Sequence, residues 1–177
     1  DGDSLTVSGP TIASGDTSGT VTTNGTTVTY TPSANFNGTT VINYTITDDG
    51  TTNGVNDFLT DTGTLTVNVT AVNDAPTGSP IATLSPGTED VPYVLSEQDL
   101  VDGFTDVEGD PISAHTIAGF PGTLTDNQDG TYTIDAGQDT HGSWTLSYQV
   151  TDDKGGSTTA TLSLTIDPVN DDPVAVA

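Results

Sequence analysis

The sequence predicts an all-β protein that contains two copies of one β-sandwich unit. Three observations predict this class: a composition rich in Thr and Val, with 20 Gly and 10 Pro among 177 residues; runs in which apolar and polar residues alternate; and the return of the same runs in the same order. Thr, Val, Ile and Tyr favour pleated strands, whereas Gly, Asn and Asp favour tight turns. We therefore expect short strands joined by turns along the whole chain.

Two pairs of alternating runs define the repeat. VINYTITDD at 41–49 corresponds to WTLSYQVTDD at 144–153, and TLTVNVTAVND at 64–74 corresponds to TLSLTIDPVND at 161–171. A two-residue period is the pattern of a half-buried strand. Upstream of these runs, Asn24-Gly25 and Asp129-Gly130 are dipeptides that favour hairpin turns. Each run is therefore predicted to be a strand, and each dipeptide the turn of a hairpin.

The two copies differ where they begin. The second copy carries residues 77–107 ahead of its EGD motif at 108–110, while the first copy begins at the equivalent of that motif. We expect a first domain at 1–74 that lacks its opening strands, a complete domain at 75–173, and the start of a further repeat at 174–177. A complete unit of about seven short strands has the size of an immunoglobulin-like sandwich with Greek-key connections.

The alternation also predicts which side chains face the two cores. The expected core residues are Tyr30, Val41, Tyr44, Ile46, Leu65 and Val67 in the first copy, and Phe104, Ile134, Trp144, Leu146, Tyr148, Leu162 and Leu164 in the second. Trp144 opens an alternating strand, so we interpret it as a core anchor rather than as a platform for a sugar.

The chain is strongly acidic, with a formal net charge of −24 and Lys154 as its one basic residue. Such a chain repels nucleic acid and anionic membranes and attracts cations. Its longest apolar runs are too short to cross a bilayer, so no membrane insertion is expected. There is no cysteine to form a disulfide, and a bound metal ion is another way to stabilise a small domain.

The acidic residues gather at the ends of predicted strands, and strand ends meet at the two poles of a sandwich. If Asp74, Asp106, Glu108 and Asp152 came within about 5 Å of one another, each pair would cost roughly 3 kcal/mol at an effective dielectric constant of about 20. A domain stable by about 5–15 kcal/mol cannot absorb several such pairs unless the groups separate, protonate or bind cations. Carboxylate and amide oxygens favour Ca²⁺. Zinc is disfavoured, because neither of the two histidines has other ligands at metal-binding spacing.

The ordered set of motifs resembles cadherin-like repeats. In the second copy the order is Glu-Asp, Asp-x-Glu-Gly-Asp, an Asp before an alternating strand, Thr-Asp-Asp and Val-Asn-Asp-x-Pro. The set is most similar to the repeats arrayed in giant bacterial surface adhesins of the RTX type, which are exported by type I secretion. The resemblance implies an extracellular protein at the bacterial cell surface, with Ca²⁺ bound between successive domains.

The resemblance also implies which residues bind the calcium ions. Asn73 and Asp74 match the family's interdomain linker, Asp106 and Glu108 match the Asp-x-Asp of the next domain, and Asp152 matches a late aspartate. By the same correspondence, Glu89, Asp139, Asn170 and Asp171 would face the following junction, and Asp1 and Asp48 the preceding one. The chain departs from the family pattern in two ways: the linker is shorter, with Ala75 or Asp172 before proline, and Asn35 stands where the second copy has Asp139.

The segment at 48–62, DDGTTNGVNDFLTDT, is seven residues longer than its counterpart after Asp152 and is rich in Asp and Asn. Two interpretations remain open for it: a solvated loop, or a small calcium loop of its own.

The expected function is that of a calcium-rigidified spacer module of a large adhesin, which stiffens an array used for cell adhesion and biofilm formation. Its partners would be neighbouring repeats of the same polypeptide or filament, with cell-surface or matrix ligands bound through other domains. One alternative is a repeat of an extracellular filament or matrix assembled by strand exchange, in which residues 173–177 pair with an open sheet edge. Another alternative is a glycan-binding module that uses Phe58, Tyr93 or Phe120. No enzyme is expected, because the acids recur with the repeat and no nucleophile and base are paired.

Overall fold

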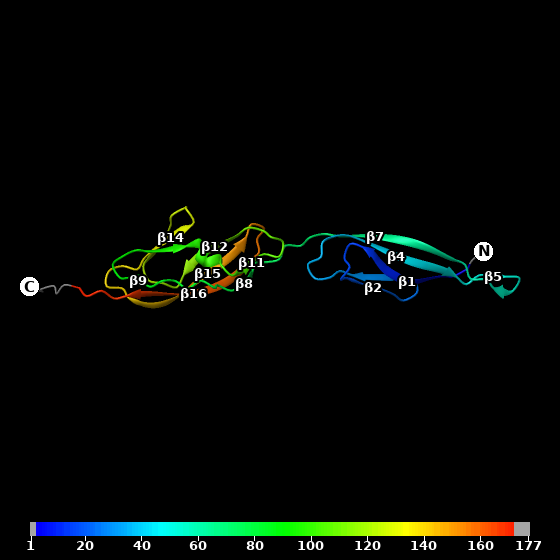
Figure 1. The fold of residues 1–177 in the computed structure, drawn as a ribbon, viewed down its shortest axis with the longest axis horizontal. Coiled ribbons are helices and arrows are strands. Elements are labelled where there is room, and N and C mark those ends of the chain that lie inside the picture. Colours follow the sequence, from blue (N-terminus) through cyan, green and yellow to red (C-terminus); the bar gives the residue numbers. More distant parts are fainter. Residues whose placement is uncertain (1–2, 172–177) are drawn as a thin grey trace, which may run out of the picture. The chain divides into compact units, whose positions relative to one another are not determined.

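The computed structural model describes residues 3–171 of the chain. It divides the chain into two compact units, unit 1 up to Val72 and unit 2 from Asn73 (Figure 1). Within residues 3–171, all regular elements except one five-residue helix are strands, so the predicted all-β class is confirmed. The predicted boundaries at 74 and 173 stay predictions, and the further repeat predicted at 174–177 lies outside the described residues.

Unit 1 has a three-stranded antiparallel sheet and a two-stranded hairpin. The sheet has the order β1-β4-β7, and the hairpin joins β2 to β3. The strands are β1 (Leu5–Ser14), β2 (Thr20–Thr23), β3 (Val28–Thr31), β4 (Gly38–Asp48) and β7 (Thr60–Val69). The predicted Asn24-Gly25 turn is present, and the side-chain oxygen of Asn24 accepts hydrogen bonds from the backbone N–H groups of Thr26 and Thr27 at 3.0 and 2.9 Å.

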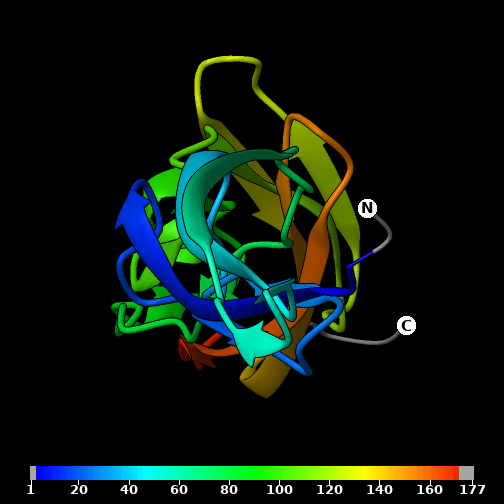
Figure 2. The same cartoon turned by 90° about the vertical axis from the view of Figure 1, so that its right-hand side faces the viewer.

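The long segment after Asp48 forms a small hairpin of its own. It pairs β5 (Thr51–Thr52) with β6 (Val55–Asn56). Asn53 and Gly54 join them with φ of 54° and 77°, the left-handed pair that a tight hairpin turn requires. Figures 1 and 2 show this hairpin, in cyan, at the end of unit 1 where β1 begins. The segment is thus regular secondary structure, and its proposed calcium binding stays a prediction.

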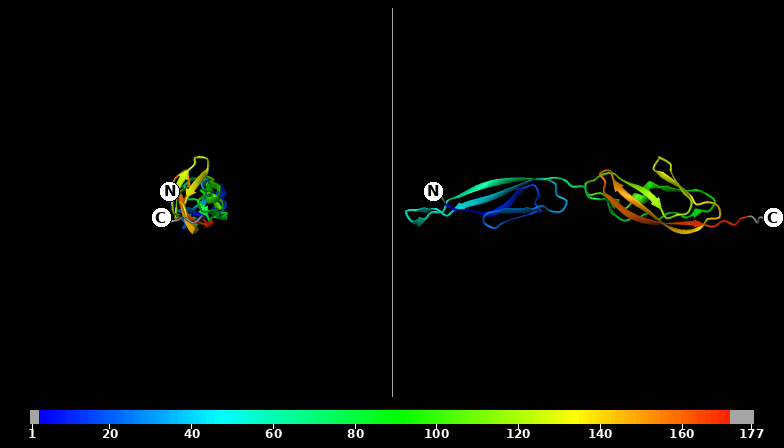
Figure 3. Two further views of the ribbon diagram at one scale, coloured as in Figure 1. Left: turned by 90° about the vertical axis from the view of Figure 1, so that its left-hand side faces the viewer. Right: turned by 180° about the vertical axis from the view of Figure 1, so that it is seen from behind.

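Unit 2 is a larger sandwich with two main sheets. One sheet has the order β12-β15-β16-β9, in which β9 runs parallel to β16; the other has the order β10-β14-β13, and a short pair joins β11 to β8. The strands are β8 (Thr77–Gly78), β9 (Gly87–Thr88), β10 (Tyr93–Ser96), β11 (Phe104–Thr105), β12 (Ile112–Ala118), β13 (Thr123–Asp126), β14 (Thr131–Asp135), β15 (Gly142–Asp152) and β16 (Ser157–Asp167). The loop between β13 and β14 projects from the body of the unit (Figure 3).

A short helix that the sequence did not predict lies between β10 and β11. This helix, α1 (Glu97–Val101), begins after Ser96, whose hydroxyl accepts a hydrogen bond from the N–H of Gln98. Leu100 is fully buried, and the carboxylate of Glu97 accepts the N–H of Ala114 at 3.0 Å. The helix is thus stabilised by its N-cap and by contacts with the sandwich rather than by its own length, since isolated helices this short do not form in water.

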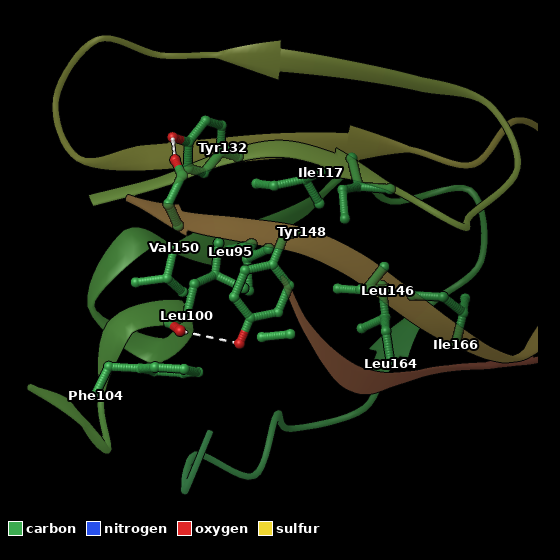
Figure 4. Packing of buried hydrophobic residues seen from close by; sticks show 13 residues of the cluster. Leu95, Leu100, Phe104, Ile117, Tyr132, Leu146, Tyr148, Val150, Leu164 and Ile166 are labelled. Atoms are coloured by element: carbon green, nitrogen blue, oxygen red, sulfur yellow. Dashed lines mark hydrogen bonds between the residues drawn. The ribbon is translucent and has the colours of Figure 1, made fainter. Parts of the chain in front are cut away.

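The core of unit 2 agrees with most of the predicted positions. Its buried apolar residues are Leu95, Leu100, Phe104, Ala114, Ile117, Tyr132, Ile134, Leu146, Tyr148, Val150, Ala160, Leu164 and Ile166. Five of the seven predicted core residues are among them, while Trp144 and Leu162 are half-buried and pack against this cluster. Figure 4 shows the hydroxyls of Tyr148 and Tyr132 pointing at backbone carbonyls within the core.

The core of unit 1 is much smaller. Ile42, which was not among the predicted core residues, is its one fully buried apolar side chain among the described residues. Tyr30, Val41, Tyr44, Ile46 and Val67 are half-buried. The core prediction for Leu65 was wrong, since its side chain is 41% exposed. Leu65 pairs directly with Ile42 and so lies on the inner face, but nothing among the described residues of unit 1 covers it.

The hydrogen bond of Tyr148 gives a measurable difference between the two units. Its hydroxyl donates to the carbonyl of Leu100 at 2.9 Å. Replacing Tyr148 by Phe should lower the free energy of unfolding of unit 2 by about 1–3 kcal/mol, because a buried carbonyl loses its partner. Tyr44 is the equivalent residue of unit 1, and its hydroxyl has no protein partner in the described part of the chain. Tyr44→Phe should therefore change stability by less than about 0.5 kcal/mol.

Urea unfolding measures both variants, with Trp144 fluorescence reporting on unit 2 and NMR signals reporting on unit 1. Equal losses in the two variants would contradict the assignment of the difference to the Leu100 carbonyl.

Candidate metal centres

Unit 2 carries two groups of acidic residues at opposite ends of one strand. β15 runs from Gly142 to Asp152, and its eleven residues place its ends about 35 Å apart. We call the group at the Asp152 end the linker pole; its members are Asn73, Asp74, Asp106, Glu108 and Asp152. The group at the Gly142 end is the far pole; its members are Glu89, Asp90, Asp139, Asn170 and Asp171.

At the linker pole, Asp152 is the most deeply held carboxylate. It is only 7% exposed, and one of its oxygens accepts the backbone N–H groups of Lys154 and Gly156, each at 2.8 Å. Its other oxygen accepts the side-chain amide of Asn73 at 3.0 Å. The amide of Asn73 first, and then the backbone donors, lower the pKa of Asp152 against the opposing effect of burial. Asp152 is therefore held as a carboxylate, and the carbonyl oxygen of Asn73 is left available.

Asp106 has one satisfied and one unsatisfied oxygen. Its first carboxylate oxygen accepts the N–H groups of Glu108 and Asp110 at 3.0 and 3.1 Å. The Asp-x-Glu-Gly-Asp sequence thus forms a tight turn around this side chain. Its second oxygen, Oδ2, is buried and has no hydrogen-bond partner. A buried carboxylate oxygen without a partner is costly, and a bound cation would satisfy it.

The linker residues are attached directly to unit 2. The N–H of Asp74 donates to the carboxylate of Glu108 at 3.2 Å, and the hydroxyl of Thr158 donates to the carbonyl of Pro76. Gly156 lies against Ala75 and the carbonyl of Asp74, where a Cβ would have no room. These contacts hold the four residues that follow Val72 against the linker pole.

The one cation nearby does not neutralise this pole. Lys154 Nζ lies 2.9 Å from the carboxylate of Asp153 and 3.7 Å from that of Asp110, and these neighbours, Asp153 first, raise the pKa of Lys154. In the part of the chain that the structure describes, the predicted metal ligands of the linker pole form no ion pair with Lys154. No three carboxylates of this pole meet within 4.8 Å in the described residues, and its role as a metal site stays a prediction.

At the far pole, Glu89 is the buried member. It is 4% exposed, and its carboxylate accepts the N–H of Val169 at 2.5 Å and contacts Nδ1 of His141 at 2.7 Å. The hydrogen bond from Val169, and then that from His141, lower the pKa of Glu89 although burial opposes them. This contact could not be predicted from short spacings in the sequence, because Glu89 and His141 lie 52 residues apart along the chain.

Three exposed carboxylates of the far pole come together. Ligand oxygens of Asp90, Asp139 and Asp171 all lie within 4.8 Å of one another. Asp90 and Asp139 have left-handed backbones, with φ of 63° and 55°, and the N–H of Asp139 donates to the carboxylate of Asp90 at 3.1 Å. Desolvation, followed by the charges of Asp139 and Asp90, raises the pKa of Asp171. A cation would relieve this repulsion.

Asp90 was not among the predicted ligands, although it directly follows Glu89 in the sequence. Asn170, which was predicted, contacts the carbonyl of Asp171 through its side-chain amide at 3.4 Å. Of the two ligands predicted for unit 1, Asp1 lies outside the described residues. Asp48 caps the β5–β6 segment by accepting the N–H groups of Gly50 and Leu59 at 3.2 and 2.9 Å.

Comparison with known proteins identifies the family. A model described as cadherin-like domain matches residues 1–69 and 72–167, so the chain belongs to the cadherin-like domain family. The chain is also similar to a solved structure described as the protocadherin GammaB4 extracellular domain, with 18% sequence identity and a TM-score of 0.43. That match covers 90% of this chain and 27% of the other. No curated protein sequence gives a significant match.

Family membership agrees with the cadherin-like sandwich predicted from the motifs. No helix in the described residues is long and apolar enough to cross a membrane.

Proposed function

We propose that this chain is a calcium-rigidified spacer of a large extracellular bacterial adhesin of the RTX type, exported by type I secretion. In this proposal Ca²⁺ binds at the poles of successive domains and stiffens an array that serves cell adhesion and biofilm formation. Family membership supports an adhesion-type module, and the net charge of −24 supports cation binding.

The observation that carries the proposal is the buried, unpartnered Oδ2 of Asp106. It belongs to a group of oxygen donors that contains no thiolate and no imidazole, the donor set that Ca²⁺ prefers. At the linker pole the ion would be held by Asp106, Glu108 and Asp152 together with the linker residues Asn73 and Asp74. At the far pole it would be held by Glu89, Asp90, Asp139, Asn170 and Asp171. In unit 1, Asp1 and Asp48 are proposed to face a further junction.

The proposed stiffening depends on the position of the linker residues in the chain. Asn73 and Asp74 directly follow Val72, the last residue of unit 1, and each forms one hydrogen bond with a side chain of the linker pole, at 3.0 and 3.2 Å. A divalent ion bound to both linker residues and to Asp106 would hold this segment in one conformation. Without the ion, repulsion between the carboxylates would favour release of the segment and a more flexible connection.

Calcium titration of the chelated protein tests the proposal. Calorimetry should detect binding with a dissociation constant of about 10⁻⁴ to 10⁻³ M, the range of extracellular calcium modules. Backbone NMR signals of both poles should shift together with the binding isotherm, and ¹⁵N relaxation at residues 72–76 should report a loss of fast motion. If calcium shifted the NMR signals of the far pole only and left the relaxation at residues 72–76 unchanged, the proposed stiffening of the linker would be contradicted.

A further inference from the structure

Unit 1 contains all three Asn-Gly dipeptides of the chain: Asn24-Gly25, Asn37-Gly38 and Asn53-Gly54. An asparagine that precedes glycine is chemically unstable in water, because the backbone nitrogen of the glycine can attack the side-chain amide carbon of the asparagine. Glycine has no side chain that would hinder this close approach. The three dipeptides are therefore candidate sites for the same modification, and the local structure decides which of them reacts.

The reaction consumes one water molecule and releases ammonia. The glycine nitrogen forms a bond to Cγ of the asparagine, the bond from Cγ to Nδ2 breaks, and the proton of the glycine N–H leaves with the amide nitrogen as ammonia. Water then opens the cyclic imide at one of its two carbonyl carbons. Opening at Cγ gives aspartate, and opening at the backbone carbonyl gives isoaspartate, in which the main chain runs through the former side chain. The reaction needs no oxidant, metal or enzyme.

Two local conditions set the rate of this reaction in a folded protein. The N–H of the glycine must be free of a hydrogen-bond acceptor, and the turn must open far enough for the nitrogen to reach Cγ. A tenfold change in rate corresponds to about 1.4 kcal/mol of barrier, and one or two hydrogen bonds can supply this difference. The hydrogen bonds around each dipeptide therefore rank the three sites.

The turn at Asn24 meets neither condition. The N–H of Gly25 donates to the hydroxyl of Thr23 at 3.1 Å, and the carbonyl of Gly25 accepts the N–H of Val7 at 2.7 Å. Oδ1 of Asn24 accepts the N–H of Thr27 at 2.9 Å. The hairpin that carries this turn pairs all four residues of β2 with β3. Asn24 is therefore protected by its own hydrogen bonds and by those of its neighbours.

The dipeptide at Asn37 lies at the start of a long strand. Gly38 is the first residue of β4 and pairs with Val69 of β7. The ring of Phe36 lies beside it, 3.8 Å from the position that a Cβ of Gly38 would take. This site can react only when the end of the main sheet of unit 1 opens.

The turn at Asn53 has neither kind of protection. It joins β5 to β6, a hairpin of two residue pairs in which every residue is exposed. In the described part of the chain, neither the side chain of Asn53 nor the N–H of Gly54 forms a hydrogen bond, and the side-chain contact of this hairpin is that of Thr52 with Asp57 at 2.6 Å. Hairpins this short are marginally stable in water, so this turn opens at the lowest cost of the three.

We propose that Asn53 is a site of spontaneous deamidation, the one Asn-Gly of this chain that the fold leaves reactive. The product carries one more negative charge than the original chain, whose formal net charge is −24. Aspartate at this position keeps the hairpin, because Asp-Gly also favours the tight turn. Isoaspartate lengthens the backbone of the turn, so Thr52 and Val55 no longer pair and the two short strands separate.

Incubation of the whole chain in neutral buffer, followed by pepsin digestion and mass spectrometry, tests the proposal. The conversion of each asparagine is followed over time in the folded chain and in urea. In urea the three sites should react at similar rates, because they share the same dipeptide. In the folded chain Asn53 should react within a few-fold of its rate in urea, while Asn24 and Asn37 should be slowed at least about tenfold.

Asn53→Gly is the matched control for the fate of the hairpin. It removes the reactive amide and leaves Gly-Gly, a dipeptide that favours the same turn. The NMR contact between Thr51 and Asn56, which pair in the hairpin, should persist in this variant throughout the incubation. In the original chain the same contact should decline as isoaspartate accumulates.

Thr23→Val tests why Asn24 is protected. It removes the hydroxyl that accepts the N–H of Gly25 and keeps the size of the side chain. Asn24 should then react several-fold faster, while the rate at Asn53 stays the same. If this variant unfolded unit 1, the comparison of the original chain when folded and in urea would still decide the proposal, because that comparison needs no substitution.

Two results would overturn the proposal. One is a folded chain in which Asn53 reacts no faster than Asn24 or Asn37. The other is a rate at Asn53 that is at least about tenfold lower in the folded chain than in urea, which would mean that the short hairpin holds its turn closed as firmly as the longer strands hold theirs.

Discussion

Replacing Asp106 by Asn should weaken calcium binding at the linker pole by about tenfold or more, because calcium affinity depends on the charge of its ligands. The same replacement should leave unit 2 at least as stable as the original in the presence of a chelator. The side-chain carbonyl of the new asparagine can still accept the N–H groups of Glu108 and Asp110, which Asp106 binds at 3.0 and 3.1 Å. The change also removes a negative charge from a buried carboxylate whose second oxygen has no hydrogen-bond partner. Thermal unfolding with calcium and with chelator measures both effects.

Asp126→Asn is the matched control for this experiment. Asp126 also accepts a backbone N–H, that of Gln128 at 2.8 Å, and the change removes the same charge from an exposed turn. It should alter neither calcium affinity nor the gain in unfolding temperature that calcium gives. If Asp106→Asn destabilised unit 2 equally with calcium and with chelator, Asp106 would be a structural turn residue and the calcium proposal would lose its main support.

The strands were predictable because their signal is local. β15 and β16 alternate over eleven residues each, and a period of two identifies such strands without knowledge of the fold. α1 was not predictable, because five residues contain too little periodicity and Leu100 is buried only through contacts with the rest of the sandwich. The parallel pairing of β9 was missed for the same reason, since two residues carry no pattern.

Alternation predicts which face of a strand is apolar, but it does not predict whether that face is covered. Leu65 lies on the inner face of β7 and was therefore expected in the core, yet it is 41% exposed. Val41 and Ile46 were both expected in the core, although residues of odd and even number point to opposite faces of one strand. Ile42, of the same parity as Ile46, is the residue that the structure buries.

For the candidate metal centres, the motifs indicated which loops carry acidic residues, but they did not predict every side chain that those residues contact. Asn73 and Asp152 were expected near each other, and their side chains form a hydrogen bond. Asp90 was missed because its approach to Asp139 depends on the left-handed backbone of both residues. Residues other than glycine adopt this conformation infrequently, and the sequence does not predict it here. The pairing of Glu89 with His141 depends on the sandwich bringing distant loops together.

Unit 1 depends on a buried carboxylate where unit 2 depends on an apolar core. Asp16 is 3% exposed, and its two oxygens accept the N–H groups of Ser18, Gly19 and Ser33 and the hydroxyls of Ser33 and Tyr30, at 2.7 to 3.2 Å. These donors come from the turn after β1, from β3 and from the loop before β4. Asp16 therefore connects the sheet of unit 1 to its hairpin.

Replacing Asp16 by Asn should abolish the cooperative unfolding of unit 1 or lower its midpoint strongly. The amide nitrogen of Asn cannot accept a hydrogen bond, so one set of donors would face another donor in a buried place. Unit 2 should unfold as before, because it shares none of these contacts. Differential scanning calorimetry, with NMR signals of Tyr30 and Trp144 to assign the two transitions, measures the effect.

The lowered pKa of Asp16 predicts how the stability of unit 1 changes with pH. Burial alone would raise the pKa of Asp16, but the hydrogen bonds from Ser33, Tyr30 and Gly19 hold it at about 2, below the ordinary 3.8. Because folding lowers this pKa, ionised Asp16 contributes its full stabilisation of unit 1 above pH 3.8, and this contribution is lost as the pH falls through about 2. Unit 1 of the original chain should therefore lose stability between about pH 4 and pH 2, and the part of this loss due to Asp16 should be missing in the Asn variant.

Asp61→Asn provides the comparison, because Asp61 is exposed and accepts only the N–H of the adjacent Thr62, at 2.8 Å. It should leave both the midpoint and the acid transition of unit 1 unchanged. If Asp16→Asn unfolded no earlier than Asp61→Asn at pH 7, the polar network would not be what holds unit 1 together. The half-buried Tyr44, Ile46 and Val67 would then have to supply its stability.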